Sequence, residues 1–358
     1  MIEAYAPGRA EFLGNHTDYN EGLVLALAIN CGTLVSGQVR TDNRILLRSE
    51  NLAESIEISL SRLHPVSRPA WSNYILGVIA LLVRRGARLT GFELTIRSTL
   101  PMGAGLGSSA ALTVATGLFL QQAFRLDANR NDLAHIAREV EKEFCGVLCG
   151  LQDPITCLSS QLGSMTFLDC RTNAVENIPV PPGAVFIIAN SGVKHALASG
   201  PYNERRADCE AAANALGLPF LRDLSSAALE AARNRLPQRL YLRAKHIVSE
   251  NERVEQAVAA LRAGDLPRLG ELMLVSQASS SLNFENSCPE LDHLVQTARK
   301  IPGCFGARLS GGGFGGATIN LVKKSAVDSF LAEMRRSVPG SEFIVTGAEG
   351  GAWSRRSA

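Results

Sequence analysis

A glycine-rich segment that runs into two serines, Pro101–Leu112, carries the clearest chemical pattern in this sequence. Glycines stand at positions 103, 105 and 107, and Ser108 and Ser109 lead into a run of helix-favouring residues. The first turn of a helix has unpaired N–H groups and a partial positive charge, so this junction suits phosphate. Its spacing matches neither a Walker A loop nor G-x-G-x-x-G. On these residues alone, a phosphate-binding loop and a plain turn capped by Ser108 or Ser109 are equally open.

Two further loops contain residues that could contact a ligand. Gly14–Asn20 holds an imidazole, a carboxylate and two amides, although Asp and Asn also favour a simple hairpin turn. Five glycines stand among the six residues Gly311–Gly316. This exceeds what a hairpin needs and favours a close backbone approach to a ligand or to the other domain over a structural bulge.

The roles of two acidic residues are judged here from their sequence neighbours alone. Asp153 precedes Pro154, which disfavours helical geometry before it and is tolerated in a first helical turn, so Asp153 is expected to cap a helix. Glu141 falls within a charged amphipathic helix and, from its neighbours, is expected to be a solvated charge.

The elements that must position these residues follow from hydrophobic periodicity. Strands are expected over residues 9–13, 23–29, 34–39, 44–48, 91–97, 164–169, 184–189, 307–309 and 317–322. Helices are expected over residues 71–85, 113–124, 132–144, 243–263, 266–280 and 291–301, with another from about residue 202. A proline-rich stretch near residue 180 predicts two domains, 1–183 and 184–358. The last strand of the second domain is expected to return to the first.

Composition narrows the class of protein. The 358 residues carry a net charge of only +2, which argues against nucleic acid as a partner. The apolar windows at 74–83 and 110–120 are too short to span a membrane and predict buried helices. The first residues do not resemble a signal peptide, so we expect a cytoplasmic protein. The eight cysteines lack metal-binding spacing and are expected to be buried free thiols.

Taken together, these segments resemble the GHMP small-molecule kinase superfamily, and its galactokinase branch in particular. Residues 9–20 are similar to the galactokinase signature Gly-Arg-Val-Asn-Leu-Ile-Gly-Glu-His-Thr-Asp-Tyr-Asn. The segment Pro101–Leu112 resembles the family phosphate loop, and Ser310–Gly316 resembles its C-terminal glycine motif. Supporting similarities lie at residues 149–153, 190–202 and 287–292, so the resemblance covers about residues 5 to 325.

The resemblance implies an α/β (α+β) fold of two domains with the active site in the cleft between them. The N-terminal domain would be like domain 2 of ribosomal protein S5, and the C-terminal domain would be ferredoxin-like. The implied reaction transfers the γ-phosphoryl group of ATP, with Mg²⁺, to a sugar, and the expected acceptor is the anomeric hydroxyl of galactose. A small sugar and ATP would be the partners; the oligomeric state, monomer or dimer, stays open.

The same resemblance implies roles for individual residues. By position, the catalytic pair is Asp153 and Arg9, and the metal ligands are Ser109 and Glu141. The ATP phosphates would lie on Gly103, Ala104, Gly105, Leu106, Gly107, Ser108 and Ser109. The sugar would contact Asn15, His16, Asp18, Gly150 and Tyr202.

Departures from the family pattern concern the sugar. Asn15 stands where galactokinases carry a glutamate, and an amide both donates and accepts hydrogen bonds. Gln152 replaces methionine, Pro154 replaces glutamine, and Leu282–Phe284 replaces a more acidic stretch. One alternative is therefore a kinase for N-acetylgalactosamine, arabinose or another sugar. The other is a silent sugar sensor, against which the retained Arg9, Ser109, Glu141 and Asp153 argue.

Overall fold

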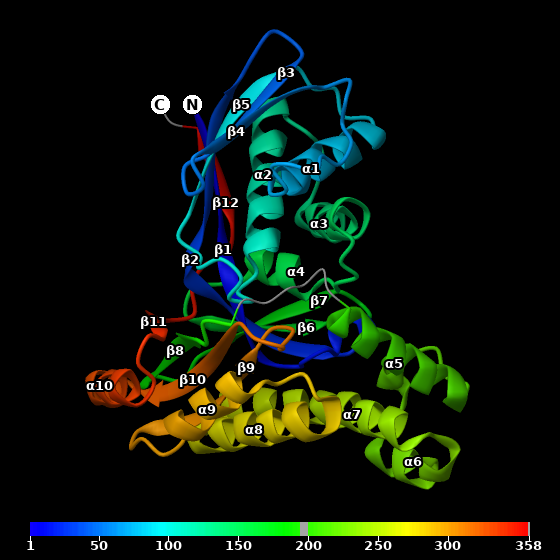
Figure 1. Ribbon diagram of the computed structural model, residues 1–358, viewed down its shortest axis with the longest axis vertical. Coiled ribbons are helices and arrows are strands. Elements are labelled where there is room, and N and C mark those ends of the chain that lie inside the picture. The colour runs from blue at the N-terminus through cyan, green and yellow to red at the C-terminus, as the bar shows by residue number, and fades with distance from the viewer. Residues whose placement is uncertain (194–199, 357–358) are drawn as a thin grey trace.

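The computed structural model describes residues 1–193 and 200–356, and its strands form two sheets (Figure 1). The larger sheet has the order β12-β1-β2-β5-β3-β4, and β6 joins it beside β2, with β7 paired to β6. Its strands are β1 (Ile2–Leu13), β2 (Leu23–Val39), β3 (Arg44–Ser49), β4 (Glu54–Ser59), β5 (Phe92–Ser98), β6 (Ser164–Asp169), β7 (Ala174–Pro179) and β12 (Trp353–Arg356). The smaller sheet has the order β11-β8-β10-β9, with β8 (Ala184–Asn190), β9 (Cys304–Ser310), β10 (Ala317–Lys323) and β11 (Glu342–Thr346).

The long strand β2 corrects one expectation, because it replaces the two strands expected at 23–29 and 34–39. Its first half is buried on both faces and reads as a continuous apolar run. Its second half alternates between buried and more exposed residues. The two halves also have different neighbours: residues 23–26 pair with β6, and residues 33–39 pair with β5.

The helices form two groups around the sheets (Figure 1). Helices α2 (Ser108–Phe124) and α4 (Gln152–Ser159) pack against the larger sheet, and α1 (Ser72–Arg84) and α3 (Arg130–Cys145) pack against α2. The second group follows β8 in the chain and comprises α5 (Pro201–Leu216), α6 (Ser226–Ala231), α7 (Gln238–Ala263), α8 (Leu266–Ser279), α9 (Pro289–Ala298) and α10 (Val327–Ser337). Every residue of α2 from Ala110 to Leu120 is buried, as its apolar sequence predicts.

The chain ends beside its beginning. Strand β12 pairs antiparallel with β1, with Tyr5 opposite Trp353, and their rings stack at 5.7 Å between centroids (Figure 1). Residue 183, where we expect a domain boundary, lies between β7 and β8, which belong to different sheets. One continuous apolar cluster nevertheless includes residues from both sides of this position, among them Phe12 of β1 and Phe186 of β8. The boundary itself stays a prediction.

The cysteine prediction was partly wrong. All eight cysteines are free, but only Cys157 and Cys209 are fully buried, and the other six are partly exposed. Strands β7, β11 and β12 and helices α6 and α10 were not expected, because their sequences are short or largely exposed. In the part of the chain that the structure describes, we find no helix with both the length and the apolar character needed to cross a bilayer.

Candidate active site

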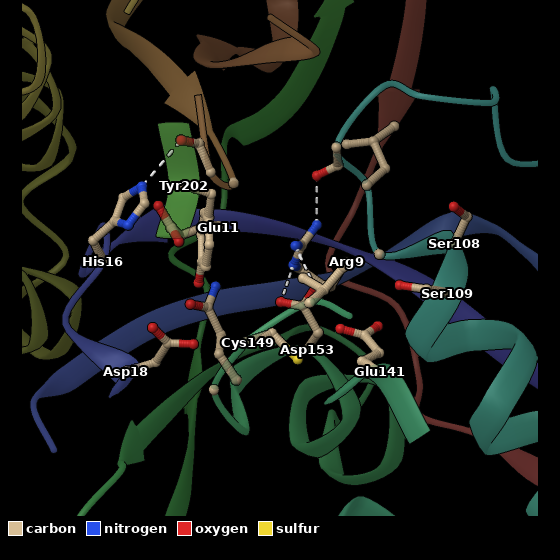
Figure 2. A pocket seen from close by; sticks show the side chains of 18 of the residues that line it. Arg9, Glu11, His16, Asp18, Ser108, Ser109, Glu141, Cys149, Asp153 and Tyr202 are labelled. Carbon is tan, nitrogen blue, oxygen red and sulfur yellow. Dashed lines mark hydrogen bonds and ion pairs between the residues drawn. The ribbon is translucent and has the colours of Figure 1, made fainter. Parts of the chain in front are cut away.

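One cavity is lined by nearly all the site residues that were predicted from the sequence (Figure 2). It lies between Gly14–Gly22, called here the polar loop, and Pro101–Leu112, called the glycine loop. Of the residues assigned to the site, only Ala104 does not line the cavity; it is buried beneath it. The lining comprises Arg9, Glu11, Asn15, His16, Asp18, Gly103, Gly105, Leu106, Gly107, Ser108, Ser109, Glu141, Val147, Cys149, Gly150, Gln152, Asp153, Tyr202, Gly311 and Gly312.

The glycine loop has the backbone that its sequence allows. Gly103, Gly105 and Gly107 all have positive φ angles, of 73°, 68° and 73°, which only glycine adopts at low cost. Gly107 is the N-cap of α2, and no side chain caps the helix. The alternative of a turn capped by Ser108 or Ser109 was therefore wrong. The first N–H groups of α2 remain available to an anion at the cavity.

Arg9 and Asp153 connect the two sides of the cavity. Arg9 Nε lies 2.7 Å from Asp153 Oδ1, and Arg9 Nη2 lies 2.5 Å from Asp153 Oδ2 (Figure 2). The same guanidinium donates from Nη1 to the carbonyl oxygen of Gly105 at 2.6 Å. Asp153 is not a helix cap as expected: Leu151 is the N-cap of α4, and Asp153 lies in the first turn. Its carboxylate instead accepts two charge-assisted hydrogen bonds from the Arg9 guanidinium.

Glu141 is buried, contrary to the solvated charge expected from its neighbours. Helix α3 begins with a capping box between Asn129 and Asp132, which fixes where its faces point. Glu141 then falls on the apolar face that packs into the protein, with only 8% of its surface exposed. Burial raises the pKa of its carboxyl group, and the side chains of Cys149 and Ser109 partly offset this rise.

Glu141 and Ser109 fit magnesium better than a metal ion whose ligands are all protein side chains. Among the described residues, we find no cluster of three or more His, Cys, Asp or Glu side chains that could hold a metal. Magnesium prefers hard oxygen ligands, retains several waters and is shared with substrate phosphates. One buried carboxylate and one hydroxyl, from Glu141 and Ser109, fit that preference.

The polar loop presents Asp18 to the cavity. Burial, together with the negative charges of Asp153 and Glu11, raises the pKa of Asp18 to about 7. Gly150 lies directly against it: a Cβ atom at position 150 would collide with the Asp18 carboxylate. Glycine is therefore required at position 150 for Asp18 to keep its place.

His16 is held in an unusual conformation beside Asp18. Its φ angle is 60°, which is uncommon for a residue other than glycine. Its Nδ1 lies 2.8 Å from the Tyr19 hydroxyl, and its Nε2 lies 3.0 Å from the carbonyl oxygen of Gly312. The Tyr202 ring packs against the imidazole at 4.9 Å between centroids. These contacts fix the ring in the wall of the cavity.

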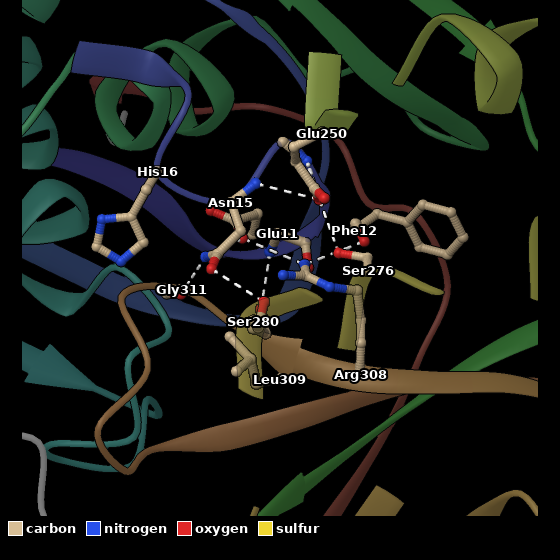
Figure 3. Close-up of polar contacts among 12 residues, drawn as sticks. Glu11, Phe12, Asn15, His16, Glu250, Ser276, Ser280, Arg308, Leu309 and Gly311 are labelled. Atoms are coloured by element: carbon tan, nitrogen blue, oxygen red, sulfur yellow. Dashed lines mark hydrogen bonds and ion pairs between the residues drawn. The ribbon is translucent and has the colours of Figure 1, made fainter. Parts of the chain in front are cut away.

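A buried polar network holds the polar loop from behind (Figure 3). Glu250 of α7 is fully buried and accepts hydrogen bonds from the Gly14 N–H at 3.1 Å and the Ser276 hydroxyl at 2.7 Å. Burial alone would raise the pKa of Glu250, but the nearby charge of Arg253 and the other polar and charged groups around it together outweigh burial and hold this pKa below its usual value. Burial lowers the pKa of His246 to about 4, so its ring is neutral and Nε2 donates to the Asn15 carbonyl oxygen at 3.1 Å.

The C-terminal glycine loop, Ser310–Gly316, meets the glycine loop. Gly311 and Gly316 have φ angles of 78° and 82°, and a Cβ atom at either would press on the backbone carbonyl of Gly105 or Ala104. This confirms the predicted close approach to another part of the fold. Among the cavity residues, sequence reasoning missed Glu11, Val147, Cys149 and Gln152, and it also missed the network residues Glu250, His246 and Arg308. No local pattern marks these residues, although Glu11, Cys149 and Gln152 fall inside segments of family resemblance.

Residues 194–199 lie outside the described residues. Part of the resemblance at 190–202, including His195, Ala198 and Ser199, therefore has no structural counterpart here. Tyr202 is described and lines the cavity.

Comparison with known proteins agrees with this geometry. The model for the GHMP kinases N terminal domain matches residues 73–161, and the model for GHMP kinases C terminal matches residues 257–340. The mevalonate kinase of Methanococcus jannaschii has the same fold, with a TM-score of 0.69 at 17% identity, covering 97% of this chain and 98% of that one. The fold and the cavity thus define a two-domain GHMP kinase.

The finer assignment comes from more similar proteins. The galactokinase galactose-binding signature matches residues 2–39. The galactokinase of Roseiflexus sp. is 39% identical, covering 93% of this chain and 86% of its own, and that of Homo sapiens is 38% identical, covering 97% and 90%. The structure of Lactococcus lactis galactokinase complexed with galactose has a TM-score of 0.94 at 32% identity, covering 98% of this chain and 95% of that one. This chain belongs to the galactokinase family.

Proposed function

We propose that this protein transfers the γ-phosphoryl group of ATP to the anomeric hydroxyl of galactose, forming galactose 1-phosphate and ADP. One observation carries the proposal: the Arg9–Asp153 ion pair lies in a single cavity between the glycine loop and the polar loop. The family relatives named galactokinase support both the reaction and the sugar. A cytoplasmic location stays a prediction.

Asp153 and Arg9 are the proposed catalytic residues. Phosphoryl transfer depends mainly on positioning the acceptor hydroxyl and on stabilising charge on the phosphoryl oxygens. Asp153 would accept a hydrogen bond from the anomeric hydroxyl, orient its oxygen toward the γ-phosphorus, and take up its proton. Arg9 would hold the Asp153 carboxylate in that orientation through its two hydrogen bonds.

The glycine loop, Gly103–Ser109, is the proposed cradle for the ATP phosphates. Ser109 and Glu141 would hold magnesium, which when bound neutralises charge on the phosphate oxygens. Burial raises the pKa of Glu141 because its charge is poorly compensated, and a bound cation would supply that compensation.

A second, more apolar cavity is the proposed nucleoside site. It shares Ser108 and Ser109 with the first cavity and is also lined by Trp71, Tyr74 and Leu100. An adenine ring needs flat apolar surfaces next to the phosphate loop, and these side chains supply them. The chain has two tryptophans, so Trp353→Phe leaves Trp71 as the only one. In that variant, ADP is expected to change the fluorescence, and galactose alone is not.

The sugar would lie against the polar loop. Asp18, His16, Gly150 and Tyr202 are the proposed contacts, and Asn15 lines the same cavity. An ionised Asp18 can accept hydrogen bonds from two neighbouring hydroxyls. A sugar that lacks one of those hydroxyls would leave a buried group unpaired, at a cost of about 1–3 kcal/mol.

The deciding experiment measures ADP release with a panel of sugars and determines where the product carries phosphate. We expect release with galactose and phosphate on the anomeric oxygen. Release with N-acetylgalactosamine or arabinose but not galactose would assign a different sugar to the same fold. No release with any sugar would identify a sugar-binding protein without kinase activity.

A further inference from the structure

A buried carboxylate in the cavity has no role in the function proposed above. Glu11 lies on β1, is only 3% exposed and lines the cavity. In Figure 2 it projects between His16 and Arg9. Its Oε1 accepts from Asn15 Nδ2 at 2.8 Å and from Arg308 Nη1 at 3.2 Å. Among the described residues, none donates a hydrogen bond to the other oxygen, Oε2.

The neighbouring amide of Asn15 has no hydrogen-bonding capacity left (Figure 3). Its Nδ2 donates to Glu11 Oε1 and to the Gly311 carbonyl oxygen at 2.7 Å. Its Oδ1 accepts from Asn286 Nδ2 at 2.8 Å and, more weakly, from the Ser280 hydroxyl at 3.4 Å. An amide group has two N–H donors and two lone pairs, so all four positions are used within the protein.

Glu11 and Asn15 also exchange the residue types of the family signature quoted above. The signature has asparagine where this chain has Glu11, and glutamate where this chain has Asn15. The pair keeps one carboxylate and one amide, joined by a hydrogen bond. Arg308, fully buried, supplies the positive charge beside the carboxylate. The carboxylate, which can only accept hydrogen bonds when ionised, therefore stands on strand β1 in this chain and not in the polar loop.

We propose that Oε2 of Glu11 binds a ring hydroxyl of the sugar, other than the anomeric one, and determines which sugars this protein accepts. Asn15 acts as a positioning residue, because it holds the Glu11 carboxylate through Oε1 and leaves Oε2 to the ligand. This inference rests on the proposed sugar kinase function. It differs from that function in assigning a sugar contact to a strand residue outside the polar loop.

The test compares galactose with its 2-, 3-, 4- and 6-deoxy analogues in wild type and in Glu11→Gln. In wild type, loss of the hydroxyl bound by Glu11 is expected to lower kcat/KM by about 10- to 100-fold. In Glu11→Gln, that one penalty is expected to shrink about tenfold, because a neutral partner makes a weaker hydrogen bond than a charged one. The penalties for the other deoxy sugars should stay as in wild type. A merely structural role would change all five sugars together.

Ser280→Ala is the matched control. Ser280 contacts Asn15 in the same network, but it does not line the cavity. Its deoxy-sugar profile should equal that of wild type. If Glu11→Gln also gives the wild-type profile, Glu11 does not bind the sugar and the inference is wrong. If wild type phosphorylates no sugar at all, the proposed function fails instead.

Two further measurements apply if Glu11→Gln does not fold. The double variant Glu11→Asn/Asn15→Glu restores the signature's arrangement and keeps the charge constant, and it should give a deoxy-sugar profile that differs from wild type. A crystal structure of wild type with galactose should place Oε2 within about 3.2 Å of one sugar oxygen. An unchanged profile in the double variant, or a separation too long for a hydrogen bond in the crystal, would overturn the inference.

Discussion

Arg9 and Asp153 lie 144 positions apart in the sequence and form a two-pronged ion pair, with Nε 2.7 Å from Oδ1 and Nη2 2.5 Å from Oδ2. Arg9 is nearly buried, with 8% of its side chain exposed, whereas Asp153 keeps 28% exposed in the cavity. Both carboxylate oxygens are therefore oriented by one planar group, while part of the carboxylate still faces a ligand. This geometry favours positioning of the acceptor hydroxyl at least as much as proton removal.

Asp153→Asn should lower the single-turnover rate of phosphorylation by about 10²- to 10⁴-fold, the usual contribution of a group in this role. Galactose binding, measured by calorimetry, should change much less. Asp169→Asn is the control, since it breaks another carboxylate–arginine pair, with Arg222, that does not line the cavity. A rate near that of wild type in Asp153→Asn would remove this carboxylate from the mechanism.

Galactose binding should depend on the ionisation of Asp18, whose pKa is raised to about 7. Hydroxyl groups donate to the ionised carboxylate, so kcat/KM for galactose should rise as the pH increases toward 7 and then level off. The stability of the sugar-free protein should change in the opposite direction. A raised pKa stabilises the fold at low pH, and this contribution is lost as the pH rises from about 4 through about 7. Asp18→Asn should remove both dependences, and a persistent inflection near pH 7 would assign it to another group.

Glu141→Gln should weaken the response to magnesium. We expect the Mg²⁺ concentration for half-maximal activity to rise about tenfold or more, because the buried carboxylate proposed to bind Mg²⁺ with Ser109 loses its charge. Glu139→Gln is a matched control on the same helix, where Glu139 forms an exposed ion pair with Arg85. The rate of ADP release is measured for both variants over a range of Mg²⁺ concentrations. Equal curves for the two variants would exclude Glu141 as a ligand.

Glu250→Ala should destabilise the protein by about 3–5 kcal/mol in urea unfolding, since it leaves Arg253 buried without its partner and removes the acceptor of the Gly14 N–H. Glu255 lies on the same helix but is exposed, and Glu255→Ala should change stability by at most about 0.5 kcal/mol. Similar losses in the two variants would show that the network behind the polar loop contributes little.

Gly150→Ala should raise the KM for galactose with little change in the KM for ATP, because the new methyl group collides with the Asp18 carboxylate. The control is Gly350→Ala, at a glycine with open space around the Cβ position. Initial rates with either substrate varied in turn separate the two constants. A rise confined to the KM for ATP would contradict this placement of Asp18.

Much of the local structure could be predicted from the sequence, because its causes are local. The apolar run after Ser109 predicts the buried helix α2, and alternating glycines predict the positive φ angles of the loop before it. The polar loop could also be found in the sequence, because the family signature that it resembles is a run of consecutive residues. The expectations for Asp153 and Glu141 were wrong when drawn from neighbouring residues alone, because the partners that decide their roles lie far away in the chain.

From the sequence alone, periodicity and turn chemistry marked many of the helices, strands and loops, because both depend on adjacent residues. The resemblance to the family implied the class of fold and the segments that meet at the cavity. Only the tertiary structure decided which side chains face that cavity. Glu11 and Asn15 are four positions apart, yet Arg308, Gly311, Asn286 and Ser280 fix their hydrogen bonds, and all four come from the C-terminal half of the chain. Hydrogen-bonding capacity is shared among neighbours in space. No pattern along the chain could show that the amide was saturated and that one carboxylate oxygen was left open.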